Sequence, residues 1–491
     1  MGFIKKLAGQ TAVYGLSSIV GRFLNYLLVP LYTRLFAPQE YGIVTELYAY
    51  AGFLAIILIY GMETSFFRYG RENRQLNISY STALGSVFSS TVLICFFILV
   101  FSSDISNAIG YSGLEIYIIF FALICGLDSI TALPFALLRL QGKAMRFAFV
   151  RLSNIFVNLG LNLFFLLLLP GLAENYLFFE SIYFENFGVG YIFLSNLIAS
   201  VVSLLLLIPE IMKVRSLPDF SLLRKMFVYA WPIMIIGLAG VVNEMFGRVI
   251  MKHLLTGSEE QNMTSLGIYG AVYKLAMLVA LFIQAYRYAA EPFFFSQALK
   301  RSAKSDFAHL MHFFIFICGS IFLIVALYID IFKYFIGERY HEGLFIVPVL
   351  LMANIWLGIY YNLSIWYKLS DKTHLGAYVA IAGAFITIVL NIWWVPVFGY
   401  AGSAWATLGC YFGMSLISYF FGKQFYHVNY NLLLVFKLLG LSVALYFIAY
   451  FFTFPIENLV FKTLLNTLLL LLYFAGGYFT LKKDLPLGFK K

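Results

Sequence analysis

Residues 81–101 read STALGSVFSSTVLICFFILVF and contain no charged side chain. At 1.5 Å per residue, a helix of this length is about 30 Å long, which matches the hydrocarbon core of a bilayer. The apolar residues follow one another directly, whereas the strands of an outer-membrane barrel alternate apolar and polar residues. The stretch therefore predicts a membrane-spanning helix.

The composition of the whole chain agrees with this prediction. Of 491 residues, 62% are hydrophobic and 11% are charged, whereas ordinary soluble domains carry about 25% charged residues. The polar residues are too few to cover a surface in water, so a soluble globular protein is excluded. A net charge of +10 fits a nucleic-acid partner only if the basic residues cluster on one surface.

Similar apolar runs recur along the chain and predict an all-α polytopic membrane protein with about fourteen transmembrane helices. Each run is bounded by turn-forming or charged residues. The four cysteines lie inside these runs and form no CxxC pair, so we expect them to be small buried hydrophobes. The expected spans are 8–36, 42–67, 81–101, 113–138, 149–169, 187–209, 226–250, 266–290, 309–331, 343–367, 375–396, 401–421, 435–452 and 457–480.

The basic residues indicate the orientation of these spans. Most of the 33 Lys and Arg residues fall in alternate connections, and short basic loops stay in the cytoplasm. The alternation predicts a multi-pass membrane protein with both termini cytoplasmic. Because the positive charge is explained by topology, we expect no nucleic-acid partner.

An internal repeat suggests the domain organisation. The pairs Gly42 and Gly267, and Tyr48 and Tyr273, occupy equivalent places in spans two and eight, and Asn162 corresponds to Asn391 in spans five and eleven. Repeats six helices apart keep the same orientation, as in parallel-repeat transporters. We therefore expect two six-helix lobes related by a pseudo-two-fold axis, at 1–215 and 216–425, and a C-terminal helix pair with a cytoplasmic tail at 426–491.

Polar side chains inside spans one and five are expensive in lipid and need either a partner or a wet cavity. Arg22 lies deep in span one and shares a helical face with Asn25, and Pro30 in the same span permits a bend. Four residues of span five recur at helical spacing and form one polar stripe. The stripe consists of Arg151, Asn154, Asn158 and Asn162. It fits either a cavity lining or an interhelical hydrogen-bond ladder.

Further ionisable residues lie in spans four, seven and eight. Glu244 and Arg248 of span seven are spaced i, i+4 and can pair. Lys274 lies in the outer half of span eight, Arg287 lies in its cytoplasmic half, and Asp128 lies in span four. The cations outnumber the acids, and guanidinium groups match phosphate oxygens. We therefore expect a pyrophosphate-binding set in the cavity, although structural ion pairs are an alternative. The set comprises Arg22, Arg248, Lys274 and Arg287.

The two acids Asp128 and Glu244 are candidates for proton or ion coupling, because buried carboxylates can take up protons. The chain has no nucleotide-binding GxxxxGK[ST] motif and no HExxH or GxSxG motif. We therefore expect no enzyme, no cofactor and no metal site.

Three segments resemble a known family. Pro30–Gly42 reads PLYTRLFAPQEYG, Leu138–Lys143 reads LRLQGK and precedes the helix of Asn158 and Asn162, and Gly399–Thr407 reads GYAGSAWAT. Their order and spacing over the whole chain are similar to those of the polysaccharide flippases, the O-antigen transporters of the multidrug/oligosaccharidyl-lipid/polysaccharide (MOP) exporter superfamily.

The resemblance implies a flippase of the inner (cytoplasmic) membrane that moves undecaprenyl-pyrophosphate-linked oligosaccharides by alternating access, powered by an ion gradient. Its partners would be the lipid-linked oligosaccharide, membrane lipids and other polysaccharide-assembly proteins. Lipid II flippases of the superfamily carry an arginine at the position matching Arg22 and a second one where this chain has Leu28. This difference favours a surface-polysaccharide substrate. A multidrug or cation antiporter and a membrane glycosyltransferase or polymerase remain as alternatives.

Overall fold

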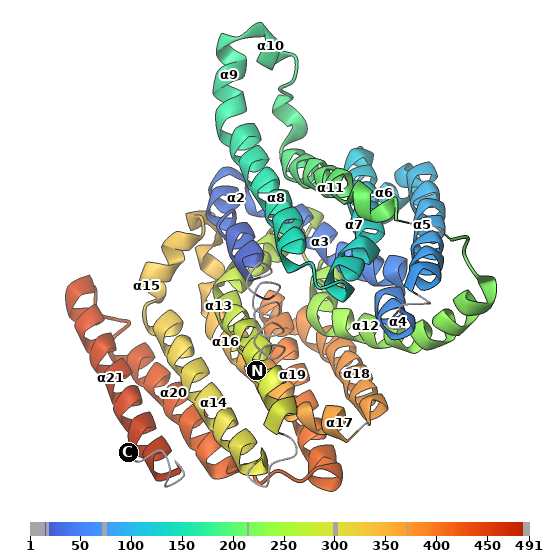
Figure 1. Ribbon diagram of the computed structural model, residues 1–491. Coiled ribbons are helices and arrows are strands. Elements are labelled where there is room, and N and C mark those ends of the chain that lie inside the picture. The colour runs from blue at the N-terminus through green and yellow to red at the C-terminus, as the bar shows by residue number, and fades with distance from the viewer. Residues whose placement is uncertain are drawn as a thin grey trace. The chain divides into compact units, whose positions relative to one another are not determined.

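The computed structural model describes residues 15, 19–70, 76–213, 216–297, 303–370 and 372–484. Throughout these residues the regular structure is helical, without a β-strand (Figure 1). Thirteen helices within them are long and apolar enough to cross a membrane. They correspond to predicted spans two to fourteen, so the all-α polytopic fold is confirmed. All four cysteines are buried and free, as expected.

The first predicted span lies partly outside the described residues. Its described part is helical at residues 19–26, turns at Leu27 and Leu28, and continues as α2 (Val29–Leu35). Pro30 is the second residue of α2, where its missing N–H leaves no intrahelical hydrogen bond unmade. The predicted bend beside Pro30 is therefore confirmed.

The chain divides into two compact units. Unit 1 contains residues 1–32 and 43–241, and unit 2 contains residues 33–42 and 242–491. Two long helices, α3 (Pro38–Ile59) and α12 (Phe220–Leu254), each contribute one part to each unit. The predicted lobe boundaries at 215 and 425 stay a prediction.

Unit 1 is built from the described residues up to Tyr32, the α3 segment after Gly42, the first part of α12, and the helices between α3 and α12. These are α4 (Met62–Tyr69), α5 (Leu76–Val100), α6 (Ser102–Ala108), α7 (Glu115–Leu140), α8 (Ala144–Leu163), a π-helical turn (Phe164–Leu168), α9 (Leu169–Asn175), α10 (Leu177–Glu180), a 3₁₀ turn (Glu185–Phe187) and α11 (Gly190–Ile211). One core of this unit packs Met62, Phe66 and Tyr80 of α4 and α5 against Leu133 of α7 and Met226 of α12.

The fifth span is longer than the sequence predicted. Its expected end at residue 169 is wrong, because α8 continues through the π-helical turn into α9 and ends at Asn175. Pro170 is tolerated there because it occupies the first turn of α9. Aromatic contacts hold this extension against α11, with Phe165 and Tyr191 stacked at 5.4 Å between ring centroids.

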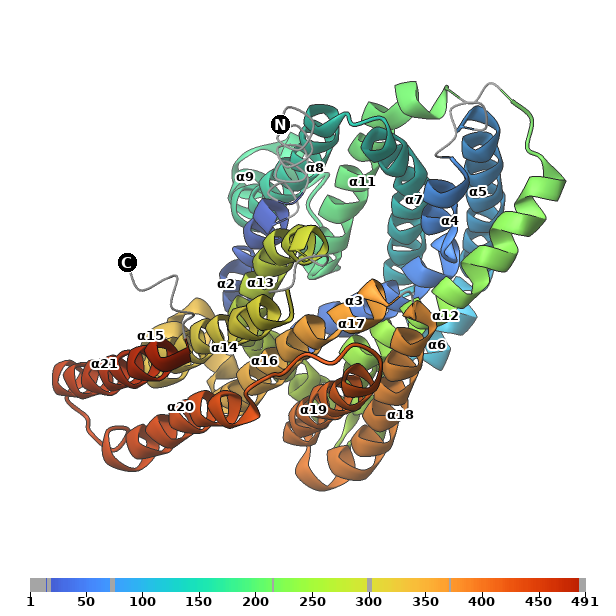
Figure 2. The same cartoon turned by 60° about the horizontal axis from the view of Figure 1, so that its bottom comes forward.

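Unit 2 contains the second part of α12 and the helices that follow it. These are α13 (Glu259–Gln297), α14 (Ala303–Leu327), α15 (Ile329–Phe332), 3₁₀ turns at Lys333–Phe335 and Glu338–Ile346, α16 (Val347–Leu363), α17 (Ile365–Leu369), α18 (Thr373–Phe398), α19 (Tyr400–Phe425), α20 (Leu432–Phe452) and α21 (Leu459–Asp484). The last two helices lie beside each other, with α20 against α14 (Figures 1 and 2).

Polar contacts attach α21 to the rest of unit 2. Lys462 of α21 donates to Asp330 of α15 at 2.6 Å, and Asn466 Nδ2 donates to the carbonyl of Leu327 at 2.7 Å. Burial acts to raise the pKa of Asp330, but hydrogen bonds and charge from Lys462 and Lys333 outweigh burial and hold that pKa below its usual value. The terminal pair is therefore part of unit 2.

Two glycines of the internal repeat meet inside unit 2. Gly267 on α13 lies against the carbonyl of Pro38, and Gly42 lies against the carbonyl of Met263. Small residues let helix backbones approach closely where no water can fill gaps. A side chain at either glycine would collide with backbone atoms.

We expect Gly267→Ala to lower the stability of unit 2 by at least about 2 kcal/mol, since backbone must shift to admit the methyl group. The matched control is Gly440→Ala in α20, where a methyl group meets no atom within 4 Å and better helix propensity should leave stability equal or slightly higher. Thermal unfolding of the purified full chain in detergent measures both. Equal melting temperatures for the two variants would contradict the close-packing argument.

Candidate functional site

The polar stripe of the fifth span lies on α8 in unit 1 and contacts three other parts of that unit. Asn154 Nδ2 donates to Ser203 Oγ of α11 at 2.9 Å, and Asn158 Nδ2 donates to Asn25 Oδ1 of the first helix at 3.3 Å. The sequence left open whether the stripe lines a cavity or forms an interhelical ladder. For these two asparagines the structure gives defined interhelical hydrogen bonds.

Asn162 completes this ladder and is fully buried. Its Oδ1 accepts from the Tyr32 hydroxyl at 2.8 Å, and its Nδ2 donates to the backbone carbonyl of Asn158 at 2.8 Å. A side chain with both ends satisfied and no exposed surface holds helices together. In this structure Asn162 therefore does not line open space, which corrects its expected place in a cavity lining.

The charged residue of the stripe, Arg151, has a different environment. Its guanidinium lies over the Phe135 ring at 4.7 Å from the centroid. It interacts electrostatically with Asp128 of α7 and with Arg22 of the first helix. Asp128 also accepts a hydrogen bond from Ser200 Oγ of α11 at 2.8 Å. The structure thus supplies the partners of Asp128 that the sequence could not identify.

This cluster leaves unit 1 with more positive than negative charge at one place. Arg22 is exposed, and it acts on Arg151 together with the cation Arg139 and the acids Asp128 and Glu63. With Arg151 itself, three positive charges stand against two negative ones, which favours an anionic ligand.

A second charged group lies nearer the end of α7. Arg139 forms an ion pair with Glu63 of α4, and its guanidinium lies over the Phe67 ring at 5.1 Å. Arg139 also interacts electrostatically with Arg151. The positive charge of unit 1 therefore extends along α7 and α8 rather than ending at Arg151.

Unit 2 contains its own cationic group on α12 and α13. The sequence allowed an i, i+4 ion pair between Glu244 and Arg248, but this pairing is not what the described residues show. The Arg248 guanidinium lies over the Tyr273 ring at 4.3 Å, and its Nη1 is 3.0 Å from the sulfur of Met245. Cation–π attraction stabilises the arginine without neutralising it.

Lys274 follows Tyr273 directly and interacts electrostatically with Arg248 and Glu244. Two cations thus share the neighbourhood of one acid. Arg287 lies farther along α13, because thirteen residues of helix correspond to about 20 Å. It stacks on the Tyr361 ring of α16 at 4.0 Å. The structure therefore brings Arg248 and Lys274 together and places Arg287 elsewhere.

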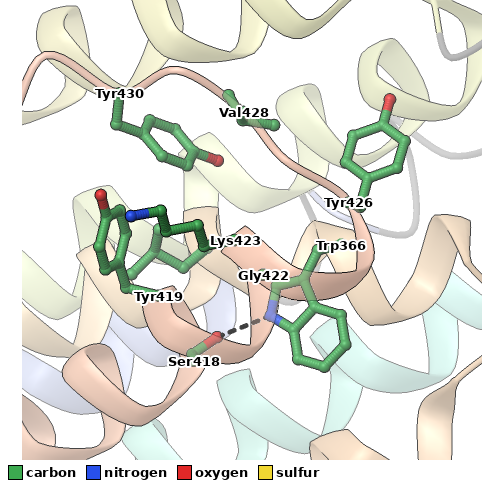
Figure 3. Close-up of a pocket in the computed structure, with 9 residues that line it drawn as sticks. Trp366, Ser418, Tyr419, Gly422, Lys423, Tyr426, Val428 and Tyr430 are labelled. Carbon is green, nitrogen blue, oxygen red and sulfur yellow. Dashed lines mark hydrogen bonds between the residues drawn. The ribbon is translucent and has the colours of Figure 1, made fainter.

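One enclosed cavity of unit 2 lies at the ends of α17 and α19 (Figure 3). Trp366, Tyr419, Lys423, Tyr426 and Tyr430 line it, and the indole N–H of Trp366 donates to Ser418 Oγ at 3.1 Å. Its cavity volume is about 10 Å³, which is roughly the space that a single water needs. It is too small for a sugar or a pyrophosphate.

Comparison with known proteins places the chain in a family. The sequence model described as "Polysaccharide biosynthesis protein" matches residues 7–298, which include the charged residues on α7, α8, α12 and α13 described above. The chain belongs to this family. No sequence among the curated proteins matches it.

Solved structures show the same fold as this polysaccharide biosynthesis protein. The lipid II flippase MurJ in an inward closed conformation is 14% identical, with a TM-score of 0.71 over 94% of this chain and 98% of its own. An inward-facing multidrug resistance MATE family transporter of the MOP superfamily is 13% identical, with a TM-score of 0.61 over 82% and 93%. The MATE transporter VcmN of Vibrio cholerae is 12% identical, with a TM-score of 0.53 over 86% and 98%. The polysaccharide family that the three sequence segments indicated is confirmed, and the solved structures share its fold.

Sequence reasoning missed the aromatic and hydroxyl partners of the charges. The guanidinium groups of Arg248 and Arg287 lie over the rings of Tyr273 and Tyr361, and Ser200 donates a hydrogen bond to Asp128. Tyr273 stands beside Lys274 in the sequence and was noted only as a repeat position. Tyr361 and Ser200 lie on other helices, so no spacing rule could connect them to their charged partners.

We expect Asp128 and Arg151 to be energetically coupled in this polysaccharide biosynthesis protein. Asp128→Ala removes the carboxylate that offsets the repulsion of Arg151 by other arginines and should destabilise unit 1, whereas adding Arg151→Gln should recover part of the loss. The coupling energy should be about 1 kcal/mol or more. Thermal unfolding of the two single variants and the double variant gives this value. Strictly additive effects would contradict the pairing, and Asp104→Ala on exposed α6 is the control.

Proposed function

We propose that this protein is a flippase that moves polyprenyl-pyrophosphate-linked oligosaccharides across the inner membrane. The supporting observation is the excess of cations over acids in each unit. In unit 1 Arg151 interacts with the acids Asp128 and Glu63 and with the cations Arg139 and Arg22. In unit 2 Lys274 interacts with the acid Glu244 and with the cation Arg248. Charged groups inside membrane spans cost several kcal/mol and are kept where they meet a ligand.

Pyrophosphate is the anion that best suits these groups. Guanidinium groups bind phosphate oxygens in a bidentate manner, and lysine adds a compact charge. A site for cationic drugs would instead carry an excess of acids. Membership of a polysaccharide biosynthesis family supports a saccharide as the cargo, and the fold shared with a lipid II flippase supports a lipid carrier.

In this proposal Arg22, Arg248 and Lys274 attract the pyrophosphate, with Arg287 as a further contact along α13. Asn25, Asn154 and Asn158 provide amide groups near Arg22. Transport proceeds by alternating access without covalent chemistry, both termini lie in the cytoplasm, and other polysaccharide-assembly proteins supply and receive the cargo.

We expect Arg22→Gln and Arg248→Gln each to lower translocation of a polyprenyl-pyrophosphate-linked oligosaccharide at least about tenfold, which corresponds to about 1.4 kcal/mol of lost interaction with the pyrophosphate. Arg22→Lys should retain part of the activity because it keeps the charge and loses the bidentate geometry. Accessibility of the sugar to an external lectin in proteoliposomes measures translocation. Lys143→Gln, an exposed charge at the start of α8, should behave as wild type.

The same proteoliposomes distinguish the alternatives. Efflux of a cationic dye without movement of the glycolipid would favour a multidrug antiporter. Elongation of the glycan or release of its lipid pyrophosphate would favour a glycosyltransferase or polymerase. Wild-type glycolipid transport by both Arg22→Gln and Arg248→Gln would overturn the anion-site proposal.

Asp128 and Glu244 are proposed to couple transport to a proton gradient, since Asp128 interacts with Arg151 and Glu244 interacts with Lys274. We expect an imposed pH gradient to accelerate translocation severalfold, and Asp128→Asn or Glu244→Gln to remove the acceleration. Glu115→Gln, at the half-buried start of α7 and outside both charged groups, is the control. Transport that is indifferent to the gradient and to both substitutions would exclude coupling through these acids.

A further inference from the structure

Unit 1 contains a groove with a cavity volume of about 540 Å³, which is within the range of sites for small ligands. It is lined from α3, α5 and the first two turns of α12. The lining residues are Ile57, Tyr60, Ser86, Ser90, Phe220, Leu223, Arg224 and Phe227. None of them belongs to the charged clusters described above, so the groove is a separate feature.

The groove exists because the second span is broken. The helix α3 ends at Ile59 and α4 begins at Met62, with Tyr60 at φ 36° and Gly61 at φ 77°. Tyr60 is the one residue other than glycine with positive φ in the described part of the chain, and such a conformation costs free energy that the surroundings must offset. A side chain at Gly61 would meet the carbonyl of Ala230, so α12 can pass close to the break.

The hydroxyl groups that line the groove already have hydrogen-bond partners within the protein. The Tyr60 hydroxyl and Ser86 Oγ share a hydrogen bond of 2.5 Å, and Ser90 Oγ donates to the carbonyl of Val87 at 3.1 Å. The Phe227 ring packs on Tyr60 at 6.1 Å. The remaining walls are hydrocarbon, so the groove suits an apolar chain and offers a sugar no free hydroxyl partner.

One end of the groove is cationic. Arg224 lies in the first two turns of α12 and is exposed, and within the described residues no ion pair or hydrogen bond of its side chain is found. Phe220 and Ile57 beside the groove are 81% and 42% exposed. By the positive-inside rule, this basic end lies at the cytoplasmic surface, where phosphate headgroups carry negative charge.

The length of the groove limits the chain that it can hold. Its longest wall runs from Phe220 to Phe227 on α12, which is about 10 Å along the helix, and one leaflet contributes about 15 Å of hydrocarbon. The groove therefore accommodates most of one lipid tail of ordinary length. A carrier of eleven isoprene units extends far beyond it.

We propose that this groove is a binding site for a phospholipid with an anionic headgroup, with the phosphate on Arg224 and one acyl chain along Leu223, Phe227 and Ile57. The site is independent of the transported glycolipid. A bound lipid would fill the space beside the Tyr60–Gly61 break and support its backbone conformation.

Native mass spectrometry of the full chain in detergent tests the site with two probe lipids of identical chains, phosphatidylglycerol and phosphatidylcholine. We expect one phosphatidylglycerol to bind about fivefold more tightly than phosphatidylcholine, because one basic residue near the membrane surface contributes about 1 kcal/mol to the binding of an anionic lipid. Arg224→Gln should remove this preference. Lys225→Gln, the neighbouring exposed cation that does not line the groove, should retain it.

A second pair of variants tests the apolar part. Ser90→Trp fills the groove and should remove the bound lipid, whereas Ser89→Trp on the adjacent exposed position should retain it. Size-exclusion profiles show whether each variant is folded. If Ser90→Trp is misfolded, the comparison of Arg224→Gln with Lys225→Gln still tests the proposed lipid site. Equal effects of Arg224→Gln and Lys225→Gln, equal affinity for the two lipids, or undisturbed binding to Ser90→Trp would each overturn the proposal.

Competition identifies the source of the phosphate. Excess inorganic phosphate should leave the phospholipid bound, because it cannot occupy the apolar groove. A polyprenyl monophosphate should compete no better than phosphatidylcholine. If inorganic phosphate alone displaced the phospholipid, the groove would add nothing to binding by Arg224, and the proposal would be wrong. If stoichiometric polyprenyl phosphate displaced it, the groove would be a site for the transported lipid, which would also overturn the phospholipid assignment.

Discussion

The absence of water from the hydrocarbon region is the constraint on which this structure depends. Each polar group inside a span must find a partner within the protein, and the simplest partner is the carbonyl one helical turn earlier. Ser195 donates to Tyr191, Asn362 to Gly358 and Asn391 to Thr387 in this way. Such bonds explain why a chain with few charges still carries many serines and asparagines inside its helices.

The same constraint explains the segment PLYTRLFAPQEYG, which served as a family marker. Tyr32 bonds to Asn162 within unit 1, whereas Thr33 Oγ1 accepts from the backbone N–H of Gly337 within unit 2. The Glu40 carboxylate accepts the N–H of Ala37 at 2.8 Å and so caps α3. The polar side chains of the segment thus form hydrogen bonds where the chain passes from one compact unit to the other. Pro30 lies just before this point, at the start of α2.

The fold could be predicted from the sequence because its strongest determinant is local. An uncharged run such as residues 81–101 has one stable state in a bilayer, whatever its neighbours are. Helix ends were less predictable, as α8 and α9 show, because aromatic contacts from Tyr191 extend the span beyond its apolar run. The Tyr60–Gly61 break lies inside a continuous predicted span, since a single glycine in an apolar run is no reliable signal.

The candidate site was predictable in its charges and not in their partners. Helical spacing suggested that Arg248 pairs with Glu244, because i, i+4 residues lie on one face. In the structure the guanidinium lies over Tyr273, a residue of another helix. Arg151 over Phe135 and Arg287 over Tyr361 repeat the arrangement. Sequence periodicity describes one helix at a time and cannot anticipate such contacts.

This choice of partner has a consequence for ligand binding. A carboxylate within a salt bridge neutralises its arginine, and an arriving anion must then compete with it. An aromatic face stabilises the guanidinium through its quadrupole and carries no net charge. The ring therefore holds the orientation of the guanidinium without cancelling its charge. An arginine held on a ring therefore suits transient binding of a phosphate better than one held by an acid, because the protein does not have to break an ion pair each time the ligand enters or leaves.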